Sequence, residues 1–412
     1  MSAGKHGAAP HAYDVAIVGG GLVGASLALA LAGAARRVLL IEGVAPDASA
    51  QPSFDERTTA LGNASRRIFE GLGVWADLAP AAAPIRAIHV SDAGHFGAAR
   101  LAAEAQQVEA FGYVITNRDI GAALWRALRS AATVTLRVPA RVTAVEVAPD
   151  GAAVTVQDGA GNEEVVTARL LVAADGAQSL VRAAAGIDNA VVEYGQVAIT
   201  AAVVADRPND GTAYERFTAD GPVAVLPLYT GGYGTVWACS EQQAAHLLAL
   251  DDAAYLAALQ ARFGWRIGRF RRVGARASYP LKLARAAATV GVRTVLIGNA
   301  AQGLHPVAGQ GFNLGLRDAA LLAEHIAAAP DPGDPTLLAG YSRARAADRG
   351  GVVRFTDTLV RVFSSRLPGV SVLRDLGLVL FDLSPPAKRA LARVSLGFGG
   401  PTPRLARGLT VS

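Results

Sequence analysis

A glycine-rich turn near the start of the sequence constrains the fold more than any other feature. The apolar run at residues 15–18 leads into Gly19, Gly21 and Gly24, which have the spacing G-x-G-x-x-G, and then into an apolar helical stretch. In such strand–turn–helix units the first glycine makes the tight turn and the second lets the backbone approach a pyrophosphate. The third lets the helix pack closely on the strand. The amides at the helix start then face the phosphates, so this pattern predicts a dinucleotide-binding α/β unit.

An acidic residue follows at the distance that this motif requires. A second apolar strand, at residues 38–41, ends at Glu42, about 20 residues beyond the turn, where an acid usually holds a ribose hydroxyl. Strand, turn, helix and acid therefore come in the right order. An ordinary glycine turn is a poor alternative, and we expect Gly19, Gly21, Gly24 and Glu42 to bind the cofactor.

Length and composition set the broad class of protein. With 412 residues, 51% of them hydrophobic, the chain suits a large α/β protein of two closely joined domains. The single cysteine, Cys239, excludes an intramolecular disulfide and a multi-cysteine metal site, and no metal is expected. The absence of a signal-peptide pattern and of a long apolar run favours the bacterial cytoplasm. Nucleic-acid binding is not expected, because no basic cluster is interleaved with aromatic residues.

Strand and helix patterns divide the chain into interleaved parts. We expect a discontinuous cofactor-binding domain at residues 13–84, 110–186 and 284–345, and a strand-rich substrate domain at 85–109 and 187–283. Residues 1–12 are expected to be a flexible leader, and 346–412 a helical basic segment. From Gly351 onwards the sequence contains nine Lys and Arg residues but only three Asp. A basic amphipathic helix can lie on an anionic membrane; the alternative is a helix pair packed on the core.

Two later segments place glycines and polar residues after apolar strands. The strand at 170–174 runs into Asp175 and a Ser–Arg turn, at the kind of strand end where α/β proteins bind ligands; the alternative is a capped turn. The strand at 294–297 runs into Gly298, Asn299 and a glycine-rich loop before a helix expected at 314–328. Amides at such a helix start can stabilise negative charge on a ring, and glycines let a flat cofactor lie close.

In this order, the three segments resemble the para-hydroxybenzoate hydroxylase-like FAD-dependent aromatic monooxygenases over nearly the whole chain. Where that family commonly has Gly-Asp, this chain has Gly298-Asn299. That departure and the run His305-Pro306-Val307-Ala308-Gly309-Gln310-Gly311-Phe312-Asn313 resemble the ubiquinone-biosynthesis branch, the 2-polyprenyl-6-methoxyphenol hydroxylases. Other stretches agree, at residues 111–114, 194–196, 215–217, 263–266, 279–281 and 383–386. The resemblance implies an α/β fold, in which a Rossmann-like FAD domain carries an inserted strand-rich substrate domain and a C-terminal helical segment.

The resemblance also implies roles near the phosphates and sugars of FAD. The pyrophosphate is expected at the glycine turn and the adenosine ribose at Glu42. Arg57 is expected to contact the diphosphate and border the active site, Arg118 to reach the ribityl chain, and Asp175 to lie near the cofactor cleft. The alternatives are that Arg57 is an ion-paired surface arginine and that Arg118 caps its helix.

Around the flavin ring, the resemblance implies that Gly298 and Asn299 meet the ribityl hydroxyls. An amide can hydrogen-bond there without the charge of a carboxylate. Pro306 and the loop residues Gly309, Gln310, Gly311, Phe312 and Asn313 are expected to flank the isoalloxazine. The candidate catalytic residues are Arg57, His305 and Pro306. His305 is a candidate for proton transfer, with a purely positional hydrogen bond as its alternative.

Several other polar or reactive residues are expected to be structural. Tyr194, Glu215, Tyr229 and Tyr279 lie in strand patterns and are expected in the core or on a sheet face rather than in catalysis. Cys239 is expected to be a small buried hydrophobe.

The implied reaction is the hydroxylation of a phenol. Reduced flavin reacts with O2 to give a flavin hydroperoxide, shielded from water, which transfers oxygen to an electron-rich ring. The implied substrate is a polyprenylated methoxyphenol, hydroxylated para to its hydroxyl to give the benzoquinol precursor of ubiquinone. NAD(P)H is the implied transient electron donor, in agreement with the single dinucleotide fingerprint. Because a prenylated substrate partitions into the bilayer, the basic C-terminal segment is expected to bind the inner membrane surface or a quinone-synthesis protein complex.

Three alternatives remain open at this point. The first is a hydroxylase of another ring position or of another phenol. The second is a flavin reductase or dehydrogenase that acts on a prenyl chain without O2. The third is a flavin-binding assembly subunit of the quinone-synthesis complex.

Overall fold

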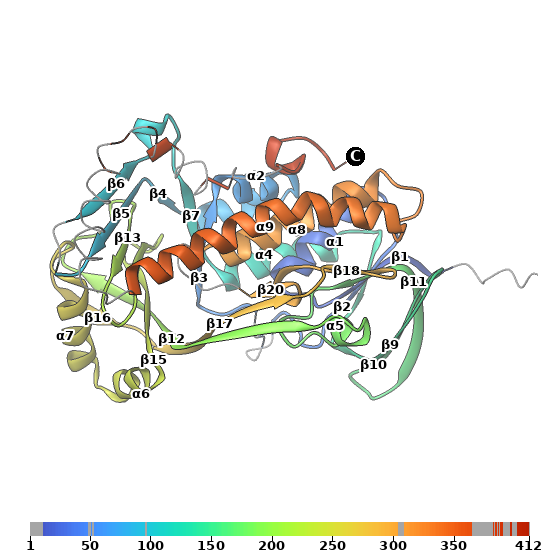
Figure 1. Ribbon diagram of the computed structural model, residues 1–412, viewed down its shortest axis with the longest axis horizontal. Coiled ribbons are helices and arrows are strands. Elements are labelled where there is room, and N and C mark those ends of the chain that lie inside the picture. Colours follow the sequence, from blue (N-terminus) through green and yellow to red (C-terminus); the bar gives the residue numbers. More distant parts are fainter. Residues whose placement is uncertain are drawn as a thin grey trace, which may run out of the picture.

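The computed structural model describes residues 11–47, 51, 53–94, 97–303 and 309–364, the last range with side chains up to 351. In the C-terminal segment it describes residues 382, 384, 386, 388, 389, 396, 397 and 402–411. Figure 1 shows the two larger sheets toward opposite ends of the molecule, with long strands running between them and a group of helices over one of them.

A mostly parallel sheet forms the first domain. Its strand order is β18-β19-β11-β1-β2-β8, and β10 and β9 extend it from β11. β1 pairs in parallel with β2 and β11, and β11 with β19, so three distant parts of the chain end at one edge. The central strands are buried apolar runs, as a sheet covered on both faces requires. The bounds are β1 (Tyr13–Val18), β2 (Val38–Ile41), β8 (Val134–Arg137), β9 (Ala140–Ala148), β10 (Gly151–Asp158), β11 (Glu163–Ala173), β18 (Val290–Gly291) and β19 (Thr294–Leu296).

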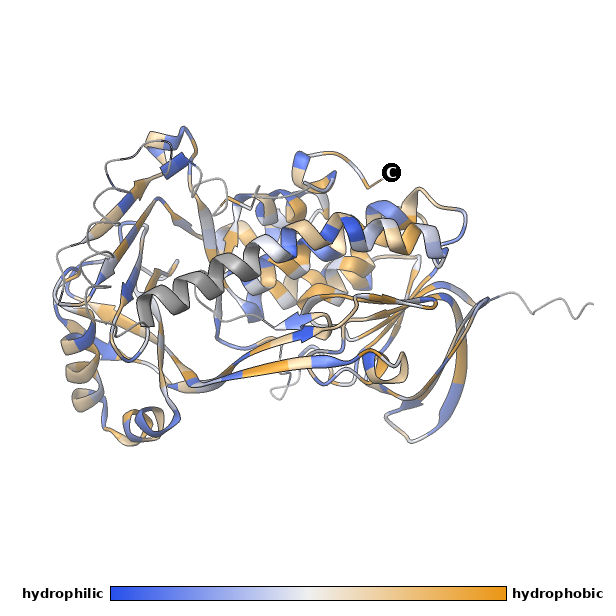
Figure 2. Ribbon diagram, in the orientation of Figure 1, coloured by the Kyte–Doolittle hydropathy of each residue, from blue (hydrophilic) through white to orange (hydrophobic). Residues whose placement is uncertain are grey.

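Helices cover one face of this sheet. α1 (Leu22–Ala32) packs between α4 (Asn117–Arg129) and α8 (Gln310–Ala327), and α9 (Pro335–Ser364) lies across α8 (Figure 1). Figure 2 shows hydrophobic residues concentrated in the helices over the sheet, and their side chains form the largest core cluster. The remaining short helices are α2 (Asn63–Gly71), α3 (Trp75–Leu78), α5 (Leu180–Ala184) and the 3-10 turns η1 (Ala79–Ala81), η2 (Glu104–Gln106), η3 (Gly298–Ala300) and η5 (Leu405–Arg407).

A nine-stranded sheet forms the second domain, in the order β20-β17-β12-β15-β14-β13-β5-β6 with β16 beside β12. α6 (Glu241–Ala249) and α7 (Asp252–Phe263) cover one of its faces. The strand bounds are β5 (Ala87–Asp92), β6 (Ala98–Ala102), β12 (Asn189–Ala205), β13 (Thr212–Phe217), β14 (Val223–Pro227), β15 (Tyr233–Ser240), β16 (Phe270–Val273), β17 (Ala277–Ala286) and β20 (Gln302–Gly303). A smaller sheet of β3 (Thr58–Gly62), β7 (Gly112–Thr116) and β4 (Ala83–Ile85) lies between the two domains.

This architecture confirms the predicted α/β fold with an inserted strand-rich domain. Strands from residues 87–102 and from 189–286 join one sheet although they are far apart in the chain. The helix expected at 314–328 begins earlier, at Gln310, because Gly309 takes a left-handed conformation and starts it there. α9 runs without a break through the expected boundary between residues 345 and 346. No helix of the described chain is long and apolar enough to span a bilayer.

Buried ion pairs fasten α9 to α8. The Arg345 guanidinium is fully buried; its Nε donates to Asp318 Oδ1 at 2.7 Å and its Nη1 to Asp348 Oδ2 at 2.5 Å. Arg317 Nε donates to the same Asp348 oxygen at 2.9 Å, and Arg349 Nε reaches Asp318 at 3.4 Å. Burial alone would raise the pKa of Asp348, but the two guanidiniums outweigh it and hold the pKa below its usual value. The network therefore fixes α9 against the helix that begins at Gly309.

Candidate active site

The turn between β1 and α1 requires its glycines for steric reasons. Gly19 has a φ of 101°, and a Cβ there would overlap the carbonyl oxygen of Ala174. A Cβ on Gly24 would overlap the carbonyl oxygen of Gly19. Gly21 is the N-cap of α1 and supplies no side-chain hydrogen bond to the first turn. The helix start thus keeps amides available for an anion, as the motif predicts.

Glu42 lies at the end of β2, directly against this turn. Its Oε2 accepts a hydrogen bond from the Gly20 amide at 2.6 Å and its Oε1 one from the Val44 amide at 2.9 Å. Trp125 of α4, which the sequence did not single out, donates from Nε1 to the Gly20 carbonyl at 3.0 Å. The carboxylate is therefore held beside the glycine turn, in the position expected for a ribose-binding acid.

The second segment is a capped turn, and it also leaves an oxygen without a partner. Asp175 Oδ2 accepts hydrogen bonds from the amides of Leu180 and Val181 at 2.9 and 3.3 Å. Among the described residues Asp175 Oδ1 has no partner, although it is buried. A buried acceptor without a donor is costly, so this oxygen is suited to a ligand hydroxyl.

A buried arginine ties the second segment to the third. Arg182 Nη1 donates to the Ala300 carbonyl at 3.1 Å, and its Nη2 donates to the Ala177 carbonyl at 2.9 Å. Gly298, with a φ of 57°, lies against Val23 of α1, and the side chain of Asn299 is exposed. All three predicted segments therefore meet around the start of α1, with Asn299 accessible to a ligand.

The third segment ends at the first turn of α8. His305 and Pro306, with the other residues of 304–308, lie outside the described residues. Gly309 is the N-cap with a φ of 59° and gives no side-chain cap. A Cβ added at Gly311 would meet only open space. Because α8 has no acidic residue in its first turn, the positive end of its helix dipole is suited to a ligand that carries negative charge.

Two of the predicted flavin-loop side chains have structural contacts of their own. Asn313 is 1% exposed and donates from Nδ2 to the carbonyls of Ala60 and Gly309, both at 2.8 Å. Its Oδ1 accepts from the Gly62 amide at 2.8 Å and the Ser65 hydroxyl at 2.6 Å. These four bonds use the capacity of the amide, so a cofactor contact by Asn313 stays a prediction for its backbone only.

The remaining side chains of that loop differ in their surroundings. The Phe312 ring packs on the core cluster beneath α8 and stacks with Phe69 at 6.2 Å between ring centroids. Gln310 is buried.

Arg57 forms a cluster with two residues that the sequence did not assign to the site. Its Nε donates to Asp55 Oδ2 at 2.6 Å, and its guanidinium carbon lies 4.3 Å from the ring centre of Tyr279. The Tyr279 hydroxyl donates to the same Asp55 oxygen at 3.2 Å. Arg57 is therefore ion-paired, and its contact with the diphosphate of FAD stays a prediction. Because Tyr279 comes from β17, the cluster also joins the substrate sheet to the cofactor domain.

Arg118 is ion-paired to Glu56 and exposed, with 57% of its side chain accessible. The alternative that it caps its helix is wrong, because the hydroxyl of Thr116 accepts the hydrogen bond from the Asp119 amide instead. Its exposed head keeps it available for a ligand.

The residues expected to be structural have varied surroundings. Cys239 is buried, as predicted, and burial raises the pKa of its thiol to about 11. Tyr229 is 54% exposed. Tyr194 and Glu215 lie in β12 and β13, on the substrate sheet.

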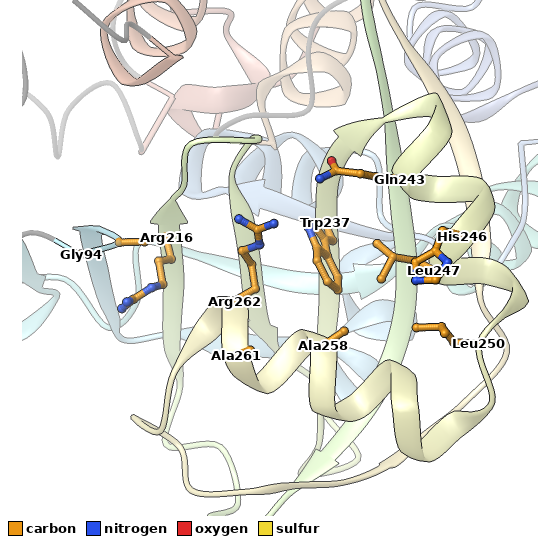
Figure 3. Close-up of a pocket in the computed structure, with 11 residues that line it drawn as sticks. Gly94, Arg216, Trp237, Gln243, His246, Leu247, Leu250, Ala258, Ala261 and Arg262 are labelled. Carbon is orange, nitrogen blue, oxygen red and sulfur yellow. The ribbon is translucent and has the colours of Figure 1, made fainter. Parts of the chain in front are cut away.

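A pocket of about 510 Å³ lies on the face of the substrate sheet that α6 and α7 cover (Figure 3). Arg216 and Trp237 enter it from β13 and β15, and Gln243, His246 and Arg262 enter it from α6 and α7. Of the predicted site residues that the structure describes, none lines it. The cofactor segments and this pocket are therefore separate features of the described chain.

The residues around the start of α1 fit FAD. The glycine turn is a cradle that a Cβ would fill, the starts of α1 and α8 lack side-chain caps, and Asp175 offers a buried free acceptor. These groups match a pyrophosphate, an electron-rich ring and a sugar hydroxyl, respectively.

Comparisons with known proteins agree with this geometry. Residues 12–356 match the FAD binding domain family. The chain is 40% identical to the ubiquinone hydroxylase UbiL of Rhodospirillum rubrum, over 98% of this chain and 94% of the relative. It is 34% identical to the 3-demethoxyubiquinol 3-hydroxylase of Escherichia coli, over 93% and 98%. The p-nitrophenol 4-monooxygenase PnpA of Pseudomonas putida shares the fold, with a TM-score of 0.78 and 20% identity over 94% of this chain and 98% of that one.

Proposed function

Since this chain belongs to the FAD binding domain family and is an FAD-dependent monooxygenase of the ubiquinone hydroxylase group, we propose that its substrate is a 2-polyprenyl-6-methoxyphenol. Hydroxylation para to the phenolic hydroxyl gives the benzoquinol precursor of ubiquinone. The observation that carries the proposal is the meeting of the three FAD segments beside the substrate sheet, together with the identity to ubiquinone hydroxylases along nearly the whole chain.

The residues of this chain bind and orient the cofactor. The glycine turn and the start of α1 would hold the pyrophosphate, and Glu42 would hold the ribose. Asp175 Oδ1 would accept from a cofactor hydroxyl, and the N-terminal end of α8 would stabilise negative charge on the flavin ring. Bound FAD supplies oxygen transfer to the ring, with O2 as co-substrate and NAD(P)H as donor. The protein also excludes water from the reacting atoms.

A second candidate is hydroxylation at another ring position. The E. coli relative is named for a 3-hydroxylase reaction on a demethoxyubiquinol, and it is 34% identical over almost its whole length. Both candidates share the flavin site and differ in how the substrate ring is turned in the substrate domain.

Lipid analysis of a strain that lacks the gene tests the proposal. Grown with oxygen, the strain is expected to accumulate a polyprenyl methoxyphenol that lacks the hydroxyl para to its first one. Accumulation of a lipid that lacks a different hydroxyl favours the second candidate. Normal ubiquinone with no accumulating intermediate, in a strain without a redundant hydroxylase, refutes both.

Complementation separates an enzyme from an assembly subunit. Gly21 lies at the N-cap of α1, so Gly21→Asp places a carboxylate where the pyrophosphate would bind. We expect this variant to lose FAD and to fail to restore quinone synthesis. If it loses FAD and still restores the lipid, a non-catalytic role is supported. Incorporation of isotope-labelled O2 into the product excludes a reductase or dehydrogenase.

The C-terminal segment supplies a further part of the proposal, namely contact with the inner membrane or a quinone-synthesis complex. The nine basic residues from Gly351 onwards support an anionic partner surface. We expect the full chain to sediment with vesicles of anionic phosphatidylglycerol and not with phosphatidylcholine alone, and salt to weaken this binding. Equal sedimentation with both lipids, or with neither, contradicts it.

A further inference from the structure

One carboxyl group of the substrate domain has no partner and no part in cofactor binding. Glu215 lies in the middle of β13 and is half-buried. Within the described chain its carboxyl makes no hydrogen bond and no ion pair. Burial raises its pKa from 4.5 to about 7. A desolvated carboxyl without a compensating cation lowers the stability of the fold. A functional role would explain why Glu215 occupies this position.

The neighbours of Glu215 in the strand show which way it points. Arg216 lines the pocket under α6 and α7 (Figure 3). Tyr214 packs against Phe263 of α7, with 5.6 Å between ring centroids. Side chains alternate along a strand, so Glu215 points to the opposite face, away from α6 and α7.

That opposite face lies toward the cofactor domain. Ala213, two positions along β13, packs in one cluster with Val114 of β7 and with Ala60 of β3. Ala60 in turn lies 3.4 Å from the position of a Cβ on Gly309, at the start of α8. Residues two apart in a strand are about 7 Å apart. On this face of β13, Glu215 is therefore the next side chain after Ala213, which lies where the substrate sheet meets the predicted flavin loop.

Apolar residues flank Glu215 on this face. Its register partners are Ala224 of β14 and Val90 of β5, and Val236 of β15 is the partner of Ala224. All three side chains are half-buried, whereas Tyr233 and Trp237, on the helix-covered face of β15, are buried. These neighbours are apolar and partly accessible, a surrounding that suits an aromatic ligand with an apolar tail beside the carboxyl.

Few titratable groups share the environment of Glu215. Asp92, at the end of β5, is on the same face, since its register partner Phe217 is two positions from Glu215. His89, Tyr214 and Arg216 belong to the opposite face. Val114 of β7, which packs with Ala213, is apolar, and the titratable Tyr113 of β7 lies beside Trp75 and Arg66 instead. Burial alone accounts for the shift in the Glu215 pKa.

We infer that Glu215 is the general base that takes the proton from the phenolic hydroxyl of the substrate, an inference that rests on the proposed function. The phenolic O–H bond breaks, an O–H bond forms on the Glu215 carboxylate, and the electron pair stays on the phenolic oxygen. The phenolate ring is more electron-rich and therefore more reactive toward an electrophilic oxygen. After oxygen transfer the ring carbon that gained the oxygen loses its hydrogen as a proton, and the C–H electron pair restores the aromatic ring and the negative charge on the first oxygen. The carboxyl then gives its proton to that oxygen.

The energetics favour a carboxyl with this titration range. A phenol such as tyrosine ionises near a pH of about 10, so little of it is ionised at neutral pH. General-base catalysis is most effective when the pKa of the base lies near the operating pH, and it typically contributes about 10²–10⁴-fold. The sequence placed Glu215 on a sheet face as a structural residue; the partnerless carboxyl gives it a chemical role as well.

The test compares the FAD-loaded full-length enzyme with its Glu215→Gln and Glu215→Asp variants. The probe is 2-allyl-6-methoxyphenol, and hydroxylated product is measured across the pH range. The wild-type rate is expected to rise through a pH of about 7 and then level off. For Glu215→Gln we expect loss of that inflection and a drop of about 10²-fold or more at about pH 8, and for Glu215→Asp a partial retention of both. Glu146→Gln, at an exposed position of β9, is the matched control and should leave the profile unchanged.

A more acidic phenol distinguishes a base from a structural residue. 2,3,5,6-Tetrafluorophenol is ionised at neutral pH and has a free para position. Because it needs no base, the rate ratio between wild type and Glu215→Gln should fall to near one with this phenol. FAD content and thermal melting of each variant report folding independently of turnover.

Two results overturn the inference. One is a Glu215→Gln enzyme that keeps the inflection near neutral pH and loses less than about tenfold in rate. The other is an equal rate loss with the acidic and the ordinary phenol. A wild-type enzyme that carries FAD and hydroxylates neither phenol refutes the proposed function itself, and the inference falls with it.

Discussion

Substitution of Asp318 tests the buried ion pairs between α8 and α9. Asp318 is 0% exposed, and its Oδ1 accepts from Arg345 and Arg349 at 2.7 and 3.4 Å. Asp318→Asn keeps the shape and removes the charge, so the guanidiniums of Arg317, Arg345 and Arg349 face Asp348 alone. Breaking a buried pair by removing one partner costs about 3–5 kcal/mol, because an uncompensated charge is left behind. We expect a loss of stability in this range.

The assay is urea unfolding followed by tryptophan fluorescence. The midpoint for Asp318→Asn should fall while the slope stays constant, which identifies a loss of native-state stability. Asp77→Asn is the control. Arg126 Nη1 lies 2.8 Å from Asp77 Oδ2, but the Asp77 side chain is 45% exposed and that of Arg126 66%. This substitution is therefore expected to lower the free energy of unfolding by only about 0.2–1 kcal/mol.

A second variant isolates the charge effect. Asp318→Asn combined with Arg345→Met should regain part of the loss, because the buried cluster then holds one cation fewer. If Asp318→Asn costs no more than Asp77→Asn, or if the double variant is less stable than the single one, the reasoning from buried charge is refuted.

Three further outcomes follow from the structure. Gly24→Ala would place a Cβ against a carbonyl oxygen of the same turn, so the purified protein should lose its flavin absorbance. Gly340, in α9, has open space around it; Gly340→Ala should therefore keep the flavin absorbance and raise the free energy of unfolding by up to about 1 kcal/mol. At about 1.36 kcal/mol per pKa unit, the raised pKa of Glu215, from 4.5 to about 7, makes the wild type lose up to ~3 kcal/mol of unfolding free energy as the pH rises between those values. Denaturation of Glu215→Gln should lack that loss, and an identical pH dependence contradicts it. Tyr279→Phe removes a hydrogen bond to Asp55 at 3.2 Å and should cost about 0.5–1.5 kcal/mol; a larger loss in thermal melting would mean that the hydroxyl has partners beyond Asp55.

The sequence by itself determined the cofactor unit and the plan of the fold. The spacing of Gly19, Gly21 and Gly24 and the distance to Glu42 specify a strand–turn–helix unit, because each glycine answers a steric requirement inside a short segment. The strand ends before Asp175 and Gly298 were also readable, since apolar runs followed by glycine are local signals. Spacing along the chain suffices where the interacting atoms are near in sequence.

Tertiary structure alone decided which polar side chains are satisfied and which are free. The sequence around Asn313 does not distinguish a side chain that binds a cofactor from one that bonds to the protein itself. Only the packing of α8 against β3 shows that its side chain makes four hydrogen bonds within the protein. Tyr279 reaches Asp55 across 224 positions of the chain. Glu215 reads as an ordinary strand residue until the folded sheet half-buries its carboxyl without a partner among the described residues. Burial and partnership are properties of surfaces brought together from distant segments, so they emerge only when the chain is folded.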